Sequence, residues 1–512
     1  MLAAIVVAAI AIALSSLAAR MYDQMHRKPN RVRSRLQKQG IRGPEPSFLL
    51  GNIAEMRRSQ AKDSRSPPVP GRVSHEWAHS LFPFLNDWSR RYGFGGMLSF
   101  MLGNILVLFV EDHELVKEIS VCTSLDLGKP SYLQKERGPL LGQGILSSNG
   151  PLWVYQRKIM SPELYMDKIK GMYGIMIESA KELVSCWEKQ IVNGDEGEVR
   201  IDLDMRNFSA DVISKACFGS SYTDGRLIFQ KLRALQRIMS SKSMLMGLPG
   251  LKYIPVKSNR ELWRLEKEIR SLILGVAEER KKGRNNARDL LQIIIEGAEN
   301  SDLSAENKAR FIVDNCKTVY FAGHETTAMS ACWTLLLLAS NPEWQARVRE
   351  EVVEVCGGRV PDPDMVNKMK LLRMVINESL RLYPTVVFMS REALEDMHFG
   401  KLMVPKGVNI WVPVISLHRD TSIWGPDADE FNPDRFVNGV AGACKVPQLY
   451  QPFGAGPRIC AGLNLAIVEL KIVLAILLTK FSFSVPSTYQ HSPVFNLVIE
   501  PEHGINLTMK KI

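Results

Sequence analysis

Apolar residues recur at helical spacing over most of the chain, and apolar runs of strand type are few and short. Amphipathic patterns predict helices over Ile175 to Val192, Asn207 to Cys217, Phe229 to Met246 and Ser258 to Gly283. A longer pattern, from Ala305 to Leu338, predicts a helix of about 34 residues, long enough to run through the centre of a globular protein. We expect strands at Ile105 to Val110, within His398 to Val414, at Phe481 to Val485 and at Ile499 to Leu507. The pattern predicts a mainly α fold with a small β region.

One stretch lacks a regular pattern. The segment from Leu125 to Gly150 is rich in glycine and proline, which interrupt both helices and strands. We therefore expect a long irregular loop there.

The N-terminus is apolar from Leu2 to Ala19 except for Ser15 and Ser16. At 1.5 Å per residue, a helix of this length spans roughly 27 Å, close to the thickness of a bilayer core. Eight lysines and arginines and one acid follow between Arg20 and Arg42. Because the positive charge follows the apolar run, we expect an uncleaved, single-pass anchor in the endoplasmic reticulum membrane with a cytosolic domain. A cleaved signal or a transit peptide is the alternative.

The composition excludes several function classes. The chain has 512 residues with a net charge of +11, which could suit a nucleic acid, a membrane or an acidic protein. It has no zinc-finger spacing, RNA-binding aromatic motif or long basic block, so we expect no nucleic-acid partner. Its eight cysteines have no paired spacing, which argues against disulfides and for a reducing compartment. His418-Arg-Asp420 is similar to a kinase catalytic loop, but the asparagine and Asp-Phe-Gly motifs that should follow are missing.

Near the C-terminus, the ten residues FGAGPRICAG, from Phe453 to Gly462, surround one cysteine with glycine, proline and arginine. This composition predicts a tight loop, and a helical pattern begins directly after it at Leu463. Amides at the helix end and the nearby Arg458 would favour a thiolate at Cys460, and the glycines would let the backbone approach a flat ligand. The alternative is a buried free cysteine beside a turn.

The centre of the long helix reads AGHETT, from Ala322 to Thr327. A glycine inside a helix costs about 1 kcal/mol relative to alanine, so Gly323 needs a reason, and clearance for a bound molecule is one. Glu325 and Thr326 offer a carboxylate and a hydroxyl in an otherwise apolar helix. Alternatively, Thr326 bonds back to its own helix and Glu325 lies at the surface. His324 lacks a ligand partner one turn later, which argues against a metal site.

Two further pairs have helical spacing. Trp153 and Arg157 would face the same way on a helix, either at a common target or as a surface aromatic stacked on an arginine. Glu378 and Arg381 would form an ion pair three residues apart, a common pattern that is weak when exposed.

Together and in this order, these segments resemble the cytochrome P450 superfamily of haem-thiolate monooxygenases. The matching motifs are Trp-x-x-x-Arg, Ala-Gly-x-Glu-Thr, Glu-x-x-Arg, Phe-x-Pro-x-Arg-Phe (431–436) and Phe-x-x-Gly-x-Arg-x-Cys-x-Gly. The resemblance implies the P450 fold, with an anchor over residues 1–19, a basic and proline-rich hinge over 20–47 and the haem-thiolate monooxygenase domain over 48–512.

The resemblance also implies roles for individual residues. Cys460 would be the axial ligand of the iron of haem b. The remaining haem-binding residues would be Arg458, Trp153, Arg157, Arg391, Phe453 and Gly454. Glu325 and Thr326 would be catalytic, delivering protons during oxygen activation. Glu378, Arg381 and Arg435 would form a buried structural network that holds the cysteine loop. The substrate pocket would include Tyr132, Leu133, Phe321, Val386, Val387, Phe388 and Phe495.

The implied reaction inserts one oxygen atom from O2 into a C–H bond or an alkene of an apolar substrate, with electrons from NADPH through NADPH-cytochrome P450 reductase. The hinge, the segment LGKPSY (127–132), AGHETT and the cysteine loop resemble a plant clan that oxidises terpenoids, and within it the branch acting on gibberellins and related diterpenoids. Alternatives are triterpenoid, steroid or fatty-acid substrates, an O2-independent haem-thiolate isomerase or dehydratase, and a non-catalytic haem sensor. A carboxylated diterpenoid would need one polar side chain to fix its acid end, which the sequence does not identify.

Overall fold

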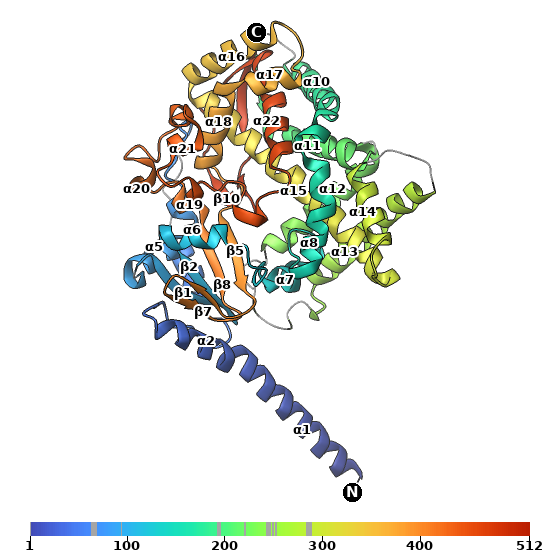
Figure 1. Cartoon of the computed structure of the whole chain (residues 1–512), viewed down its shortest axis with the longest axis vertical. Helices are drawn as coiled ribbons and strands as arrows, with labels where there is room; N and C mark the ends of the chain where they lie inside the picture. The colour runs from blue at the N-terminus through green and yellow to red at the C-terminus, as the bar shows by residue number, and fades with distance from the viewer. Residues whose placement is uncertain are drawn as a thin grey trace.

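A long central helix, α15, organises a mostly helical body in the computed structural model (Figure 1). The structure describes residues 2–62, 69–93, 95–191, 196–219, 222–241, 247, 250, 253–282 and 289–512. Helix α15 runs from Ala305 to Ser340, and its side chains from Phe311 to Ala339 are mostly buried. It begins at Ser304, whose side chain accepts a hydrogen bond from the Asn307 amide. The predicted central helix is thus confirmed.

The helices around α15 occupy the predicted amphipathic segments. They are α10 (Tyr173–Gln190), α11 (Ile201–Phe218), α12 (Tyr222–Ser241), α13 (Lys257–Lys281) and α14 (Leu290–Glu299). Three expected helix ends, Val192, Met246 and Gly283, lie outside the described residues. Two C-terminal helices, α18 (Lys370–Leu382) and α22 (Leu463–Leu478), also pack on α15, so the core is built around its middle.

Shorter helices complete the body. They are α3 (Ile53–Lys62), α4 (Ala78–Leu81), α5 (Pro83–Tyr92), α6 (His113–Val121), α7 (Ser131–Leu141), α8 (Gly150–Met160), α9 (Met166–Lys170), α16 (Pro342–Cys356), α17 (Pro363–Lys368), α19 (Val414–Leu417), α20 (Thr421–Trp424) and α21 (Gly439–Ala443). Helix α7 corrects the expectation of an irregular loop over 125–150. Its Gly138 and Pro139 disfavour a helix locally, but it packs against α15, α12 and α13, and this tertiary contact outweighs propensity.

Within the described residues, the β region consists of four small sheets. The largest has the strand order β1-β2-β8-β5-β3, in which β2 and β8 run parallel and the other pairs are antiparallel. Its strands are β1 (Met97–Leu102), β2 (Ile105–Val110), β3 (Leu127–Gly128), β5 (Phe388–Ala393) and β8 (Asn409–Pro413). The pair β6 (Met397–Phe399) and β7 (Leu402–Val404) accounts for the rest of the expected 398–414 region.

The last two sheets are formed by strands from the C-terminal end of the chain together with β4. Strand β12 (Asn506–Lys511) lies between β4 (Glu196–Arg200) and β9 (Phe481–Ser484), and β10 (Pro493–Phe495) pairs with β11 (Ile499–Pro501). The single strand expected at Ile499 to Leu507 is therefore wrong, because β11 and β12 are separate strands in different sheets.

The N-terminal helix extends away from the body, with the N-terminus at its far end (Figure 1). Helix α1 (Leu2–Tyr22) continues through a π-helical turn (Asp23–Arg27) into α2 (Lys28–Gln37), so the basic segment expected as a hinge is helical as far as Gln37. In the described part of the chain, one helix, Ile5–Gln37, is long and apolar enough to cross a membrane. Buried Arg33 then ties α2 to the following turn, donating to the Glu45 carboxylate at 2.8 Å and to the Gly43 and Pro44 carbonyls.

Candidate active site

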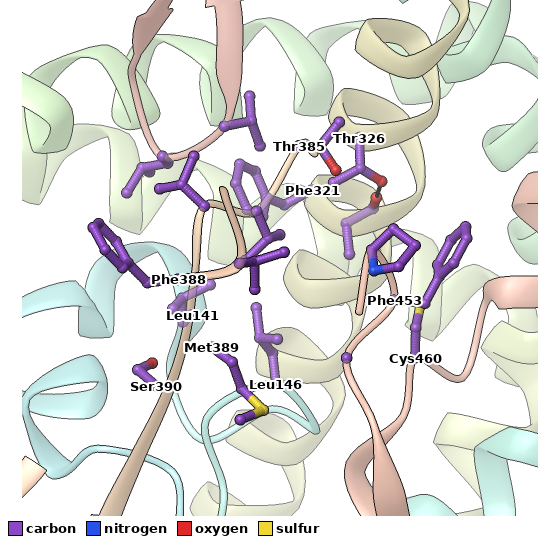
Figure 2. Close-up of a pocket in the computed structure, with 18 of the residues that line it drawn as sticks. Leu141, Leu146, Phe321, Thr326, Thr385, Phe388, Met389, Ser390, Phe453 and Cys460 are labelled. Carbon is purple, nitrogen blue, oxygen red and sulfur yellow. Dashed lines mark hydrogen bonds between the residues drawn. The ribbon is translucent and has the colours of Figure 1, made fainter. Parts of the chain in front are cut away.

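A cavity of about 830 Å³ lies between the middle of α15 and the loop that carries Cys460 (Figure 2). Its wall also includes residues of α7, α8, α11, β5, the β10–β11 turn and the start of α22, and most of these side chains are apolar. Figure 2 shows Cys460 and Phe453 on one side of this space, with Thr326 on α15 close by. The cavity therefore joins the predicted ligand loop to the predicted oxygen-handling helix.

Cys460 presents its thiol to the cavity from a loop that the backbone holds tightly. The Cys460 amide donates to the Phe453 carbonyl at 2.9 Å, and Gly454 has φ of 72°, a conformation that favours glycine. Gly456 also has a positive φ, and a Cβ there would lie 2.1 Å from the Ser120 carbonyl oxygen, so the loop packs directly on α6. Glycine is thus required for loop shape and packing.

The expectation that the loop alone favours a thiolate needs correction. Burial raises the pKa of the Cys460 thiol, while a backbone hydrogen bond from Gly462 and the charges of Arg157 and Lys129 lower it less. Arg458 instead lies over the Trp153 ring, 4.1 Å from its centroid, and donates to the Ser148 carbonyl. A bound metal ion is what deprotonates a coordinating thiol outright.

Trp153 and Arg157 both face the cysteine loop from α8, as their spacing predicts. Trp153 stacks under Arg458, and Arg157 donates to the Ile459 carbonyl at 2.7 Å. Buried Arg391 on β5 lines the same cavity, and burial lowers its pKa to about 10, so it keeps its charge at neutral pH.

Lys129 joins this group and was missed by sequence reasoning. It lines the cavity, and burial, Arg391 and Arg458 hold the pKa of its amine well below the usual value. In the sequence, Lys129 stood out only as part of the LGKPSY segment (127–132) that resembles the plant clan. A concentration of cations around an accessible thiol, beside a loop shaped by glycines, fits a flat dianionic macrocycle with an iron centre.

Thr326 lines the cavity, whereas Glu325 does not. The Thr326 hydroxyl donates to the Ala322 carbonyl at 2.6 Å, so it bonds back to its own helix while remaining at the cavity wall. Glu325 is 1% exposed, and its carboxylate accepts from Arg206 on α11 at 2.8 Å. Arg206 also pairs with Glu500 on β11. The Arg206 charge holds the pKa of Glu325 below its ordinary value despite burial.

Gly323 provides clearance for a neighbouring helix. A Cβ at this position would lie 2.4 Å from Cδ1 of Ile213 on α11. Gly323 also lines the cavity, so the close approach of α11 is a second reason for this glycine beside clearance for a bound molecule. His324 beside it is buried, which lowers the pKa of its ring to about 4, and no group of three potential metal ligands exists among the described residues.

The three charges of the expected structural network lie together. Arg381 donates to both oxygens of Glu378, at 2.6 and 2.8 Å, and Arg435 reaches the same carboxylate at 3.4 Å. Glu378 and Arg381 are fully buried. Removing any one of these three side chains would leave a buried charge without one of its partners.

His418 connects this network to the cysteine loop and was also missed. Its Nε2 accepts from the Gln451 amide at 2.9 Å, and its Nδ1 lies 3.2 Å from the Arg381 carbonyl oxygen. Burial and Arg381 lower the pKa of the His418 ring to about 3, so the neutral ring both accepts and donates. Gln451 lies two residues before Phe453, so the loop is fixed at its start.

Comparisons with known proteins agree with this arrangement. The cytochrome P450 family model matches residues 68–509. The chain belongs to the cytochrome P450 family. Similar relatives are cytochrome P450 714C2 of Oryza sativa subsp. japonica, 50% identical over 95% of this chain and 94% of the relative, and cytochrome P450 714B3 of Zea mays, 43% identical over 97% and 94%. Cytochrome P450 714A2 of Arabidopsis thaliana is 42% identical over 93% and 92%.

This P450 is a monooxygenase of the haem-thiolate type, of the plant group to which these relatives belong. In this family the bound haem, with its thiolate ligand, activates dioxygen. All seven expected pocket residues line the cavity of this P450: Tyr132, Leu133, Phe321, Val386, Val387, Phe388 and Phe495. Phe388 stacks on Trp411 with ring centroids 5.0 Å apart, and the Trp411 indole donates to the Tyr132 hydroxyl at 3.2 Å. These contacts hold the aromatic wall in place.

Glu469 is a buried acid in the cavity wall that sequence reasoning missed, although an acid in the apolar run of α22 was a visible signal. It is 0% exposed and accepts from the Ser209 hydroxyl at 2.7 Å. Burial raises its pKa to about 8, so the P450 carries this carboxyl in its neutral form at pH 7.

Proposed function

We propose that this P450 hydroxylates or epoxidises a terpenoid, such as a gibberellin or a related diterpenoid acid. The observation that carries the proposal is the apolar cavity of about 830 Å³ that opens onto Cys460. The end of the cavity beside Cys460 would hold the haem, and the aliphatic and aromatic wall of the remaining space suits an apolar substrate. Chain similarity to plant relatives over more than nine tenths of their length supports a plant metabolite as substrate.

The geometry supports the residue roles that we propose. Cys460 would ligate the haem iron, Phe453 and Gly454 would contact the haem beside it, and Trp153, Arg157, Arg391 and Arg458 would hold the propionates. Thr326 would hold or pass a proton at the cavity wall, because its hydroxyl lies there. Glu325 would act through its ion pair with Arg206, at a distance from the cavity surface.

Electrons would come from NADPH through NADPH-cytochrome P450 reductase, and the haem would be haem b. The domain over 48–512 would face the cytosol, anchored in the endoplasmic reticulum membrane by residues 1–19 and joined through 20–47. The helix Ile5–Gln37 supports an anchor by its length and composition.

The test is reconstitution of the full chain with reductase in yeast microsomes, followed by incubation with a panel of gibberellins and diterpenoid acids. We expect NADPH- and O2-dependent products that gain one oxygen atom, traced with 18-oxygen gas. Product formed without O2 and reductase would favour an isomerase or dehydratase, and no turnover over terpenoid, steroid and fatty-acid panels would favour a haem sensor.

The ligand assignment has a separate readout. Cys460→Ser should abolish the long-wavelength carbon monoxide band of the reduced protein, because that band requires a thiolate ligand. A band that survives this substitution would overturn the role of Cys460.

A further inference from the structure

The charged residues in the wall of this mainly apolar cavity are mostly basic. Among the described residues that line it, one is acidic, Glu469, and five are basic: Lys129, Arg137, Arg157, Arg391 and Arg458. Glu469 is neutral at pH 7, because burial raises its pKa to about 8. A cavity with this charge balance attracts anionic molecules and gives little repulsion to a carboxylate.

Four of the five cations belong to the cysteine end of the cavity. The charges of Lys129 and Arg157 act on Cys460, and those of Arg391 and Arg458 act on Lys129. Arg458 also lies over Trp153, which we propose holds a haem propionate with it. These four basic residues therefore lie at the end of the cavity where a haem, with its two negative charges, would bind.

Arg137 lies elsewhere, on α7. The charges that act on it are those of Tyr132 and Glu136 on the same helix. Arg137 shares a helix face with Leu133 and Leu141, at spacings of four residues, and all three line the cavity. Figure 2 shows Leu141 well separated from Cys460 across the cavity, which places this face of α7 away from the haem end.

The Arg137 side chain is suited to bind an anion. The residue is 6% exposed, and burial lowers its pKa only to about 10, so the guanidinium is charged at neutral pH. A guanidinium has five N–H donors in a planar fork, which can serve a ligand carboxylate in addition to protein acceptors. The surrounding apolar wall strengthens such a charged hydrogen bond, because little water competes for it.

We propose that Arg137 binds the carboxylate of an apolar carboxylic-acid substrate and so directs the far end of that molecule toward Cys460. This inference rests on the proposed oxidation of a diterpenoid acid and names the side chain that fixes its acid end. Arg137 is then a specificity-determining residue that selects acids over their esters and alcohols of the same shape.

The test is substrate binding to the haem-loaded full chain, measured without reductase by the spectral shift that follows displacement of water near the haem. The ligands are ent-kaurenoic acid, a tetracyclic diterpenoid acid, and its methyl ester. We expect wild type to bind the acid about 10- to 100-fold more tightly than the ester, because a hydrogen-bonded charge is lost in the ester. Arg137→Gln should weaken acid binding by that factor and leave ester binding within about threefold, and Arg137→Lys should retain part of the preference.

Lys135→Gln is the matched control, because Lys135 is an exposed cation on the same helix, and it should bind both ligands as wild type does. The carbon monoxide band of each variant reports that the haem site is intact. The inference is overturned if wild type binds the ester as tightly as the acid, fails to bind the acid, or keeps its preference in Arg137→Gln. These results would leave the monooxygenase proposal standing, since that proposal is tested by O2-dependent turnover.

Discussion

Arg206 Nε lies 2.8 Å from Glu325 Oε1, so the acid at the centre of α15 is paired with α11 and does not line the cavity. Arg206 also meets Glu500 at 2.5 Å and Asp202 at 3.4 Å. Residues from α11, α15 and β11 thus share one buried cation. Any part that Glu325 has in catalysis must be transmitted through this pair or through a movement that breaks it.

Breaking the pair should strongly destabilise the protein. Arg206→Leu leaves the Glu325 carboxylate buried without its counter-charge, and we expect a loss of about 3 to 5 kcal/mol in the free energy of unfolding. Adding Glu325→Leu should recover part of this loss, with a coupling energy of about 1 to 3 kcal/mol in a double-mutant cycle measured by chemical denaturation. Additive effects of the two substitutions would contradict a direct pair.

Thr326→Ala should uncouple electron flow from product. The hydroxyl at the cavity wall is lost, and proton delivery by a positioned group contributes about 10²- to 10⁴-fold to rate. We expect NADPH consumption to continue with more of it appearing as peroxide, measured beside product in the reconstituted system. Thr326→Ser keeps the hydroxyl and should behave much like wild type. Unchanged coupling in Thr326→Ala would remove the proton role.

Gly323→Ala should destabilise the contact between α15 and α11. The added methyl would lie 2.4 Å from Ile213 Cδ1, and overpacking of this kind costs about 1 to 3 kcal/mol, more than the gain of about 1 kcal/mol in helix propensity. Ile213→Val in the same chain should restore part of the stability. Gly275→Ala is the matched control on α13, since nothing lies within 4 Å of a Cβ there, and it should stabilise the protein. Melting temperatures of these variants decide the matter.

Glu469 should make the stability of the protein fall with rising pH. An ordinary glutamate releases its proton near pH 4.5, whereas Glu469 keeps it to about pH 8 in the folded state. Between these values the folded protein holds a proton that the unfolded chain has released, so stability falls by about 1.4 kcal/mol per pH unit.

Glu469→Gln has no proton to hold and keeps an acceptor for Ser209. Between pH 5.5 and 7.5 the wild type should lose about 2 to 3 kcal/mol relative to this variant, measured by denaturation at both pH values. A difference that does not vary with pH would mean that Glu469 is ionised in the folded protein.

Residue spacing predicted the features that depend on local pattern. The central helix, the cysteine loop and the pairing of Glu378 with Arg381 follow from segments whose geometry is encoded within a few residues. Helix α7 was not predicted, because Gly138 and Pro139 disfavour a helix. Its packing on α15 stabilises it instead. Without α7 as a helix, the placement of Arg137 on the cavity wall could not be foreseen.

Two of the missed site residues, His418 and Lys129, share one physical reason, whereas the acid in the apolar run of α22, Glu469, was visible in the sequence. His418 and Lys129 act through partners that are distant in the sequence, and nothing in their own neighbourhood marks those contacts. Glu325 was identified from the sequence as an unusual residue in an apolar helix. Its partner Arg206 is 119 residues away, so the helix alone could not show that the Glu325 side chain points toward α11. Long-range pairing decides where a charged side chain points.

The clamp that Arg33 forms with Glu45 and the neighbouring carbonyls fixes the turn after α2, and Arg35 of α2 pairs with Asp396 at 2.6 Å, so the N-terminal helix has a fixed joint with the body of the protein. The helix and the body of the protein should therefore move together. If α1 lies in a bilayer, a change in bilayer thickness that tilts the helix must also rotate the domain, and with it the direction from which a membrane-dissolved substrate meets the cavity. Lipid composition would thus act on substrate capture without touching a single residue of the cavity wall.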